Sequence, residues 1–127
     1  MTREEPRSSY NTFDLEEALE RVDGDTEFFG ELVETFFDSA AELVPQMRKA
    51  LKEGDPETFR RAAHSLKGAV GNFGAKKAYD LCYQLETKGR EGNLAGAGEL
   101  LSQLEEMIQT LEEELRQAQE ELVSEGA

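Results

Sequence analysis

Cysteine, histidine and tryptophan are almost missing from this chain of 127 residues, which contains one cysteine, one histidine and no tryptophan. A single thiol, Cys82, cannot form a disulfide within the chain, as is usual for proteins of the reducing cytosol. A single histidine leaves too few nitrogen and sulfur ligands for a zinc site. We therefore expect no metal and no bound cofactor, and we expect Cys82 to be a small buried hydrophobic residue.

Long apolar segments and basic residues are also scarce. No run approaches the roughly 18 apolar residues of a membrane span, and the start of the chain lacks the apolar segment of a signal peptide. Lysine and arginine number 14 against 28 acidic residues, a formal net charge of −14. Nucleic acids and anionic membranes repel such a chain. The composition predicts a cytoplasmic protein whose partner is neither a nucleic acid nor a membrane.

The hydrophobic pattern is helical throughout, and no segment alternates as a strand does. We expect residues 1–12 to be polar and flexible. The expected helices are a short one from Asp14 to Arg21 and four longer ones over residues 26–52, 56–73, 75–88 and 95–122. Short links between long helices imply antiparallel neighbours. The sequence predicts an all-α fold, an up-and-down antiparallel four-helix bundle with a short extra N-terminal helix.

Several residues indicate where these helices begin, bend and end. Asp14 and Glu17 are spaced as a capping box for the first helix. We expect Pro45 to bend the long second helix, because its ring clashes with the carbonyl four residues back. Asp55 is placed to cap the helix that contains the histidine. Gly74 permits the left-handed turn that ends it.

The last helix carries much of the negative charge, with nine acidic residues from Glu99 onward and only Arg116 on the basic side. Its apolar seam, typical of a bundle or coiled coil, consists of Leu101, Leu104, Ile108, Leu111, Leu115, Ala118 and Leu122. We assign residues 13–116 to the domain and residues 117–127 to an acidic, polar end. We expect this end to fray and the chain to be a monomer, with dimerisation through the last helix as the alternative.

The one histidine lies on the polar face of its own helix. The apolar residues of that helix recur at steps of three and four, at Phe59, Ala63, Leu66, Val70 and Phe73. His64 falls roughly 140° from the centre of their face, so we expect it to be exposed. Gly68 and Gly71 lie on its exposed side, although each costs about 1 kcal/mol relative to alanine inside a helix. We interpret them as part of a docking surface, where the absence of side chains keeps the ring accessible to a second protein.

Positive charge gathers around the histidine. Five basic residues and no acidic one stand between Thr58 and Tyr79, namely Arg60, Arg61, Lys67, Lys76 and Lys77. Such a cluster would compensate a phosphoryl group and attract an acidic partner site. A solvated helix surface with chance clustering is the alternative.

One exposed imidazole supports few kinds of chemistry. Acyl transfer needs a serine or cysteine nucleophile beside the base, and we expect the thiol of Cys82 to be buried. Without strands there is no glycine-rich loop of the kind that binds nucleotide phosphates. What remains is the use of His64 itself as a nucleophile, in a reaction whose other half is supplied by a second molecule.

Glu86 is the candidate for holding the ring. If the two helices that flank Gly74 are antiparallel, His64 and Glu86 lie ten and twelve residues from the turn, at a similar level. Glu86 also borders the helix interface, roughly 80° from the centre of its own apolar face. There it can accept the ring N–H and fix the tautomer. An ordinary surface glutamate is the alternative. We expect Arg90, one turn beyond, to be solvated, with assistance in phosphate binding as the alternative.

The run from His64 to Gly74 resembles the signature of histidine phosphotransfer domains, in which lysine follows the histidine at the third position and glycine at the fourth and tenth. The similarity extends over about residues 13–115. It implies a four-helix bundle in a two-component phosphorelay, whose histidine accepts a phosphoryl group from a receiver-domain aspartate and passes it to another receiver. By this resemblance, His64 is the phosphoacceptor and Lys67 neutralises the phosphate.

The resemblance also gives Glu86 the position of the side chain that orients the imidazole, and Gly68 the position that leaves room for the receiver. The docking candidates are Arg61, Lys67, Gly68 and Gly71. Such domains lack kinase and phosphatase machinery, so we do not expect an enzyme, and Mg²⁺ belongs to the receiver. The implied partners are receiver domains of response regulators or hybrid sensor histidine kinases. The alternatives are a chemotaxis-type module, phosphorylated by a separate ATP-binding domain, and a helical adaptor without phosphotransfer.

Overall fold

The computed structural model describes residues 10–126, and within that range the chain forms helices and turns without strands. The five helices are α1 (Leu15–Arg21), α2 (Thr26–Glu53), α3 (Pro56–Gly71), α4 (Lys76–Glu91) and α5 (Ala97–Gly126). The expectation of an all-α chain is confirmed. Most of the expected flexible segment, residues 1–9, lies outside the described residues. None of the described helices combines the length and apolarity needed to cross a membrane.

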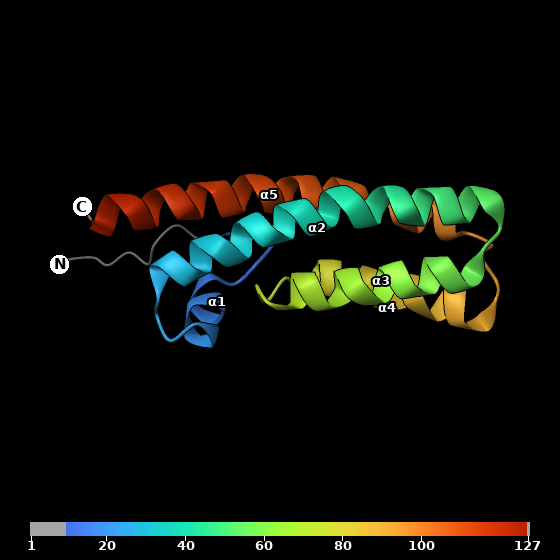
Figure 1. The fold of residues 1–127 in the computed structure, drawn as a ribbon, viewed down its shortest axis with the longest axis horizontal. Helices are drawn as coiled ribbons and strands as arrows, with labels where there is room; N and C mark the ends of the chain where they lie inside the picture. Colours follow the sequence, from blue (N-terminus) through green and yellow to red (C-terminus); the bar gives the residue numbers. More distant parts are fainter. Residues whose placement is uncertain (1–9, 127) are drawn as a thin grey trace.

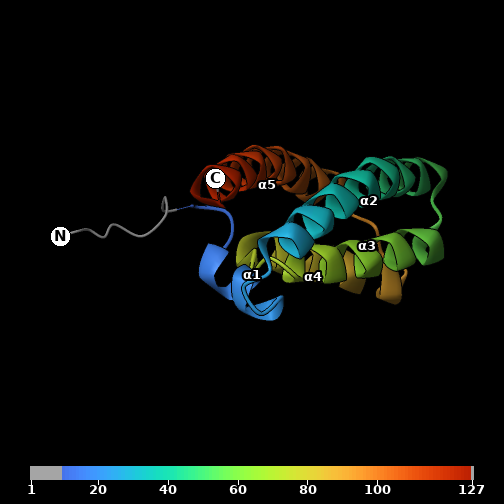
Figure 2. The same cartoon turned by 60° about the vertical axis from the view of Figure 1, so that its left-hand side comes forward.

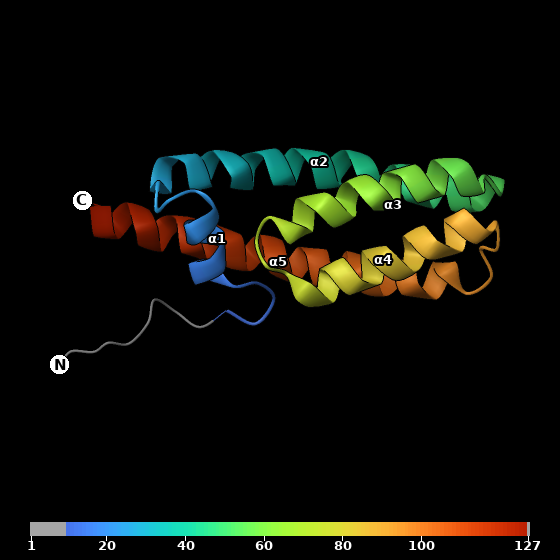
Figure 3. The same cartoon turned by 90° about the horizontal axis from the view of Figure 1, so that it is seen from below.

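The four long helices lie lengthwise beside one another. Figure 1 shows α2 and α5 along one side of the molecule and α3 and α4 along the other. Each of them packs against two others, and α3 and α4 form the most extensive of these pairs. Figures 2 and 3 show the short α1 at one end of the molecule, close to the turn between α3 and α4. The fold is therefore a helical bundle with one end covered by α1.

The start of α1 is tied to the end of α3. Asp14 caps α1 by accepting a hydrogen bond from the N–H of Glu17, as expected. The reciprocal half of the expected capping box is wrong, because the carboxylate of Glu17 pairs with Arg21 instead. The backbone N–H of Asp14 donates instead to the carbonyl of Phe73 at 3.0 Å, so Phe73 accepts the hydrogen bond that the capping box would give to Glu17.

Aspartate caps and glycine ends also delimit the longer helices. Asp55 accepts from the N–H of Thr58 at the start of α3. α2 continues through Pro45 as one helix to Glu53. α4 runs to Glu91 rather than ending at residue 88, because Gly92, at φ 70°, provides the left-handed end.

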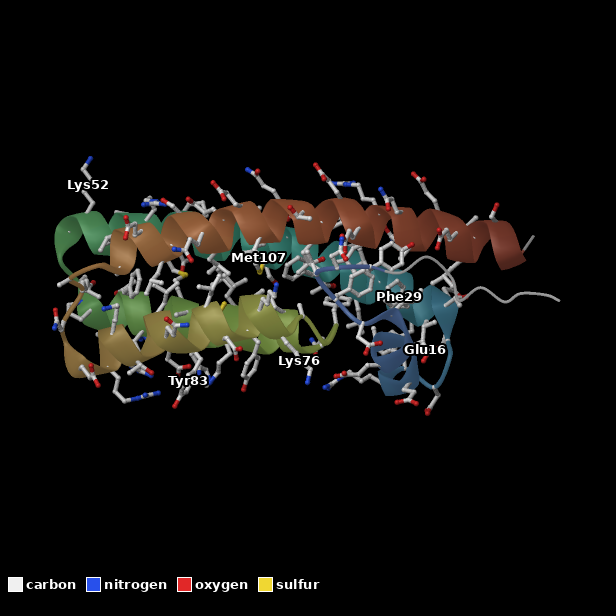
Figure 4. All side chains as sticks on the ribbon, turned by 180° about the vertical axis from the view of Figure 1, so that it is seen from behind. Glu16, Phe29, Lys52, Lys76, Tyr83 and Met107 are labelled. Carbon is white, nitrogen blue, oxygen red and sulfur yellow. The ribbon has the colours of Figure 1, made fainter. Side chains whose placement is uncertain are left out.

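The core lies between the apolar faces of the helices. The expected face of α3 is buried along its whole length, and Phe73 after it packs edge-on against Phe29 and Phe36 of α2. Burying each such side chain stabilises the fold by about 1.5–3 kcal/mol. Figure 4 shows Phe29 between the helices and Lys52 projecting from the surface. Cys82 is buried as expected, and burial raises the pKa of its thiol to about 12.

The end of α5 differs from the sequence expectation. The helix continues to Gly126, and Ala118 and Leu122 are buried, which contradicts fraying from residue 117. The reason is that α2 and the segment before α1 cover this end. The hydroxyl of Tyr10 donates to Glu121 at 2.7 Å, and that of Thr12 donates to Glu114 at 2.8 Å. The expected flexible segment therefore does not reach residue 12.

Candidate functional site

His64 lies in the middle of α3 and presents its ring to solvent, with 62% of the side chain exposed. The apolar face of α3 points the other way, into the core, so helical periodicity alone fixes this exposure. One turn along, Gly68 leaves open space, because a Cβ built there would meet no atom within 4 Å. The ring is therefore accessible from the side of Gly68.

A buried carboxylate lies directly behind the exposed ring. Glu86 of α4 is only 2% exposed, and its Oε2 lies 2.9 Å from Nδ1 of His64. An ionised carboxylate can only accept, so Nδ1 carries the proton and donates it in this hydrogen bond. The other ring nitrogen, Nε2, then keeps its lone pair. The structure thus brings together the two residues that the helix geometry placed at a similar level.

Two cations hold the same carboxylate. Nζ of Lys67 lies 2.8 Å from Oε1 of Glu86, and Nη2 of Arg90 lies 3.0 Å from Oε2. Burial raises the pKa of the Glu86 carboxyl, but the hydrogen bonds from Lys67 and His64 outweigh it and hold that pKa below its usual value. Glu86 is therefore ionised at neutral pH, which agrees with its role as acceptor. The expectation that Arg90 is simply solvated is wrong, and its spacing of four from Glu86 was the available signal.

Lys67 is also flanked by aromatic rings that the sequence analysis did not single out. Its Nζ lies 5.7 Å from the ring centroid of Tyr79 and 5.3 Å from that of Tyr83, both on α4. The two tyrosines are exposed, and Figure 4 shows Tyr83 projecting outward from α4. Their spacing of four on the polar face of α4 is the signal that could have identified them. Hydrogen bonding to Glu86 raises the pKa of Lys67.

The expected docking residues occupy different settings around the ring. Gly71 is partly covered, because a Cβ there would lie 3.4 Å from the ring of Tyr79. Gly74, at φ 66°, makes the left-handed turn after α3. A groove of about 510 Å³ extends from Gly68 past Gly71 and Tyr79 to Arg21 of α1. α1 therefore adds a wall to the surface beside the histidine.

The positive charge around the histidine is partly neutralised in the structure. Nη2 of Arg60 lies 2.7 Å from Oε2 of Glu57, and Nε of the exposed Arg61 lies 3.9 Å from the same oxygen. Lys67 is paired with Glu86. Glu57 precedes the segment without carboxylates, but it lies three and four residues before Arg60 and Arg61, so all three side chains lie on the same side of α3. The cluster is thus less positive than the sequence count indicates.

The described residues offer an exposed nucleophile at His64. Within the part of the chain that the structure describes, no three histidine, cysteine or carboxylate side chains gather as metal ligands do. His64 instead combines an available Nε2, an Nδ1 proton held by a buried anion, and an uncovered approach past Gly68. This arrangement suits the transient attachment of a group to the ring.

Comparison with known proteins shows which family the chain belongs to. A family model of the Hpt domain matches residues 31–114, which include all of α3 and α4. Histidine-containing phosphotransfer protein 2 of Arabidopsis thaliana is 28% identical over 86 residues, covering 65% of this chain and 55% of that protein. Histidine-containing phosphotransfer protein 5 of the same plant is 29% identical over 79 residues, covering 57% and 50%. The chain spans about half the length of these curated relatives.

A solved structure extends the likeness to the fold. The crystal structure of histidine-containing phosphotransfer protein B (HptB) from Pseudomonas aeruginosa PAO1 superimposes with a TM-score of 0.82 at 26% sequence identity. The match covers 89% of this chain and 98% of that protein, so it reaches beyond the residues of the family model. Because the family model matches well over half of the sequence, the chain belongs to the Hpt domain family, the family whose histidine motif the run around His64 resembles.

Proposed function

We propose that this chain carries a phosphoryl group on His64 between receiver domains of a two-component phosphorelay. The observation that carries the proposal is the pairing of an exposed ring with a buried carboxylate, joined at 2.9 Å through Nδ1. Such a pair orients the imidazole and leaves Nε2 facing outward as the nucleophile. Membership of the Hpt family supports the same assignment.

In the proposed transfer, the lone pair of Nε2 attacks the phosphorus of a receiver's aspartyl phosphate. The P–N bond forms as the P–O bond to the aspartate breaks, and the aspartate leaves as a carboxylate. The ring keeps its proton on Nδ1 and becomes positively charged, and the anionic Glu86 stabilises that charge. Transfer to the next receiver reverses these steps, with an aspartate oxygen attacking the phosphorus.

Lys67 supplies the charge compensation in this proposal. It lies three residues after His64 on α3, so both side chains project from neighbouring positions of one face. In the unphosphorylated chain its ammonium is held by Glu86 at 2.8 Å. We propose that the ammonium turns toward the phosphoryl oxygens when His64 is loaded, while Arg90 stays on Glu86 at 3.0 Å.

The receiver docks over the surface that keeps the ring accessible. We assign this contact to Gly68, Gly71, Arg61 and Lys67, as the sequence predicts. The open space at Gly68 and the neighbouring groove support the assignment. The partners are receiver domains of response regulators or hybrid sensor histidine kinases, and Mg²⁺ belongs to the receiver.

In the same proposal, α2 to α5 form an up-and-down four-helix bundle and α1 is the short extra helix. Figure 3 supports it, because the colours of α2, α3, α4 and α5 advance in alternating directions along the bundle. The chain acts as a phosphoryl carrier with no kinase or phosphatase activity of its own. A monomeric state and a cytoplasmic location stay predictions from the sequence.

Phosphotransfer from a labelled receiver tests this function. The purified chain is incubated with a receiver domain that carries radioactive phosphate on its aspartate. We expect the chain to acquire an acid-labile, alkali-stable label that His64→Gln abolishes and the exposed control Lys52→Gln retains. Label that survives His64→Gln would overturn the assignment. Label acquired only from an ATP-binding kinase domain would favour the chemotaxis-type alternative, and no label from either donor would favour the adaptor.

A further inference from the structure

Gly89 lies at a very close approach between the backbones of α3 and α4. A Cβ built at Gly89 would lie 2.8 Å from Cβ of Arg60 and 2.9 Å from its Cα and its backbone N. Atoms of the backbone and Cβ cannot move aside as the end of a flexible side chain can. At the present separation of α3 and α4, only glycine fits at this position.

The local backbone does not explain this glycine. Gly89 is absent from the described residues with positive φ, so its conformation is open to any residue. It does not end the helix either, because Gly92 adopts the left-handed conformation and its N–H donates to the carbonyl of Gly89. Glycine inside a helix is less favourable than alanine. The missing side chain therefore serves the close approach to Arg60.

This contact lies next to the histidine and its carboxylate. Arg60 precedes His64 by one turn on α3, and Gly89 follows Glu86 by three residues on α4. We propose that Gly89 is a positioning residue, which lets the two helices come close enough for Glu86 to reach Nδ1 of His64. The inference rests on the proposed function, because the hydrogen bond it protects is the one that prepares Nε2 for transfer.

The size of the effect follows from the distances. Carbon atoms in contact lie about 3.5 Å apart or more, so Gly89→Ala must separate the helices locally by about 0.7 Å. The same separation would lengthen the 2.9 Å contact between His64 and Glu86 to about 3.6 Å, beyond a hydrogen bond. A free imidazole prefers its proton on Nε2. Loss of the contact therefore moves the proton onto the nitrogen that must attack.

Nitrogen NMR reads this tautomer directly, because the chain contains one histidine. The protein is labelled with ¹⁵N-histidine and measured at about pH 8.5, well above the pKa of a free imidazole. We expect a protonated Nδ1 in the parent chain and a shift toward protonated Nε2 in Gly89→Ala. Gly98→Ala is the matched control, since its Cβ would lie at an ordinary 3.7 Å from Leu51. An unchanged tautomer in Gly89→Ala would overturn the inference.

Transfer rates show whether Gly89 acts through Glu86. We expect Gly89→Ala to slow phosphoryl transfer about tenfold or more, as small displacements of reacting groups do. In a Glu86→Ala background the same substitution should change the rate less than twofold. Equal slowing in both backgrounds would contradict a positioning role. If the parent chain accepts no phosphate at all, the proposed function fails, while the tautomer comparison still decides whether Gly89 positions Glu86.

A second variant keeps the test decisive if Gly89→Ala does not fold. Glu86→Asp withdraws the carboxylate by one methylene group without changing the contact between the helix backbones. We expect it to give the same shift toward protonated Nε2 and a comparable slowing of transfer. If Glu86→Asp keeps both the tautomer and the rate of the parent chain, the distance between the helices is not critical and the inference is wrong.

Discussion

Replacing Glu86 with glutamine separates the charge of this side chain from its hydrogen bond. An amide oxygen at the position of Oε2 can still accept the proton of His64 Nδ1, but the amide NH₂ at the position of Oε1 then faces the ammonium of Lys67, which is a donor too. Glu86 is 2% exposed, whereas Lys67 and Arg90 retain access to water. A hydrogen bond to a charged group contributes about 1.5–3 kcal/mol, and this access reduces the loss. We expect Glu86→Gln to destabilise the fold by about 1–3 kcal/mol at pH 7.

The destabilisation should depend on pH in a defined direction. The pKa of Glu86 is lower in the folded chain than its usual value, so its charge stabilises the fold above the usual carboxyl pKa. That stabilisation is lost as the pH falls through the lower, folded pKa. At acid pH the protonated glutamate resembles glutamine. The difference in unfolding free energy between the parent chain and Glu86→Gln should therefore shrink below about pH 4.5.

Urea unfolding followed by circular dichroism measures this difference. With a slope of about 2 kcal/mol per molar, a loss of about 2 kcal/mol lowers the midpoint by about 1 M. Glu91→Gln, at an exposed position of the same helix, is the matched control and should leave the midpoint nearly unchanged. A midpoint of Glu86→Gln equal to that of the parent chain, or a difference that stays constant with pH, would refute the reasoning.

Three further results follow from the structure. Gly68→Gln should leave the circular dichroism spectrum unchanged but slow transfer from a receiver at least tenfold, because the new side chain fills the open space beside His64; a large loss of helicity would contradict this mechanism. Leu122→Ala should lower the unfolding free energy by about 2 kcal/mol in urea, because this end of α5 is packed; an unchanged midpoint would mean that the end frays. The thiol of Cys82 should react with a disulfide reagent at pH 8 only on unfolding, since burial raises its pKa to about 12; fast reaction in the folded protein would show that it is accessible.

Most of the site can be predicted from the sequence, by helical periodicity and by the turn at Gly74 that reverses the direction of the chain. The apolar stripe of α3 decides that His64 faces outward, and counting from the turn at Gly74 decides that Glu86 lies at its level. Both arguments use only the backbone geometry of helices, which neighbouring side chains hardly alter. The capping residues Asp14 and Asp55 follow from equally local rules.

Side-chain pairing and helix ends depend on tertiary contacts that local rules do not contain. Glu17 has both Asp14 and Arg21 within reach, and only the proximity of Phe73 leaves the arginine as its partner. The spacing of four predicts the pairing of Arg90 with Glu86, but the burial of Glu86 depends on how α4 turns this edge toward α3. The expected helix ends at residue 88, yet Gly89 lies inside α4, where Arg60 requires a residue without a side chain.

The end of α5 shows the same limit. Its last turns are polar in sequence apart from a few apolar positions, so local propensity favours fraying. The covering surface comes from the start of α2 and from residues near Tyr10, about a hundred positions away in the chain. The burial of Ala118 and Leu122 against these distant segments outweighs the local tendency of this end to fray.

The position of the phosphorus on the ring tests the central claim most directly. Phosphorus and nitrogen NMR of the ¹⁵N-histidine chain, loaded by a phosphorylated receiver, shows which imidazole nitrogen forms the P–N bond. Because Glu86 holds the Nδ1 proton, we predict a bond to Nε2 of His64 with Nδ1 still protonated. A phosphoryl group on Nδ1, or on any residue other than His64, would contradict the account.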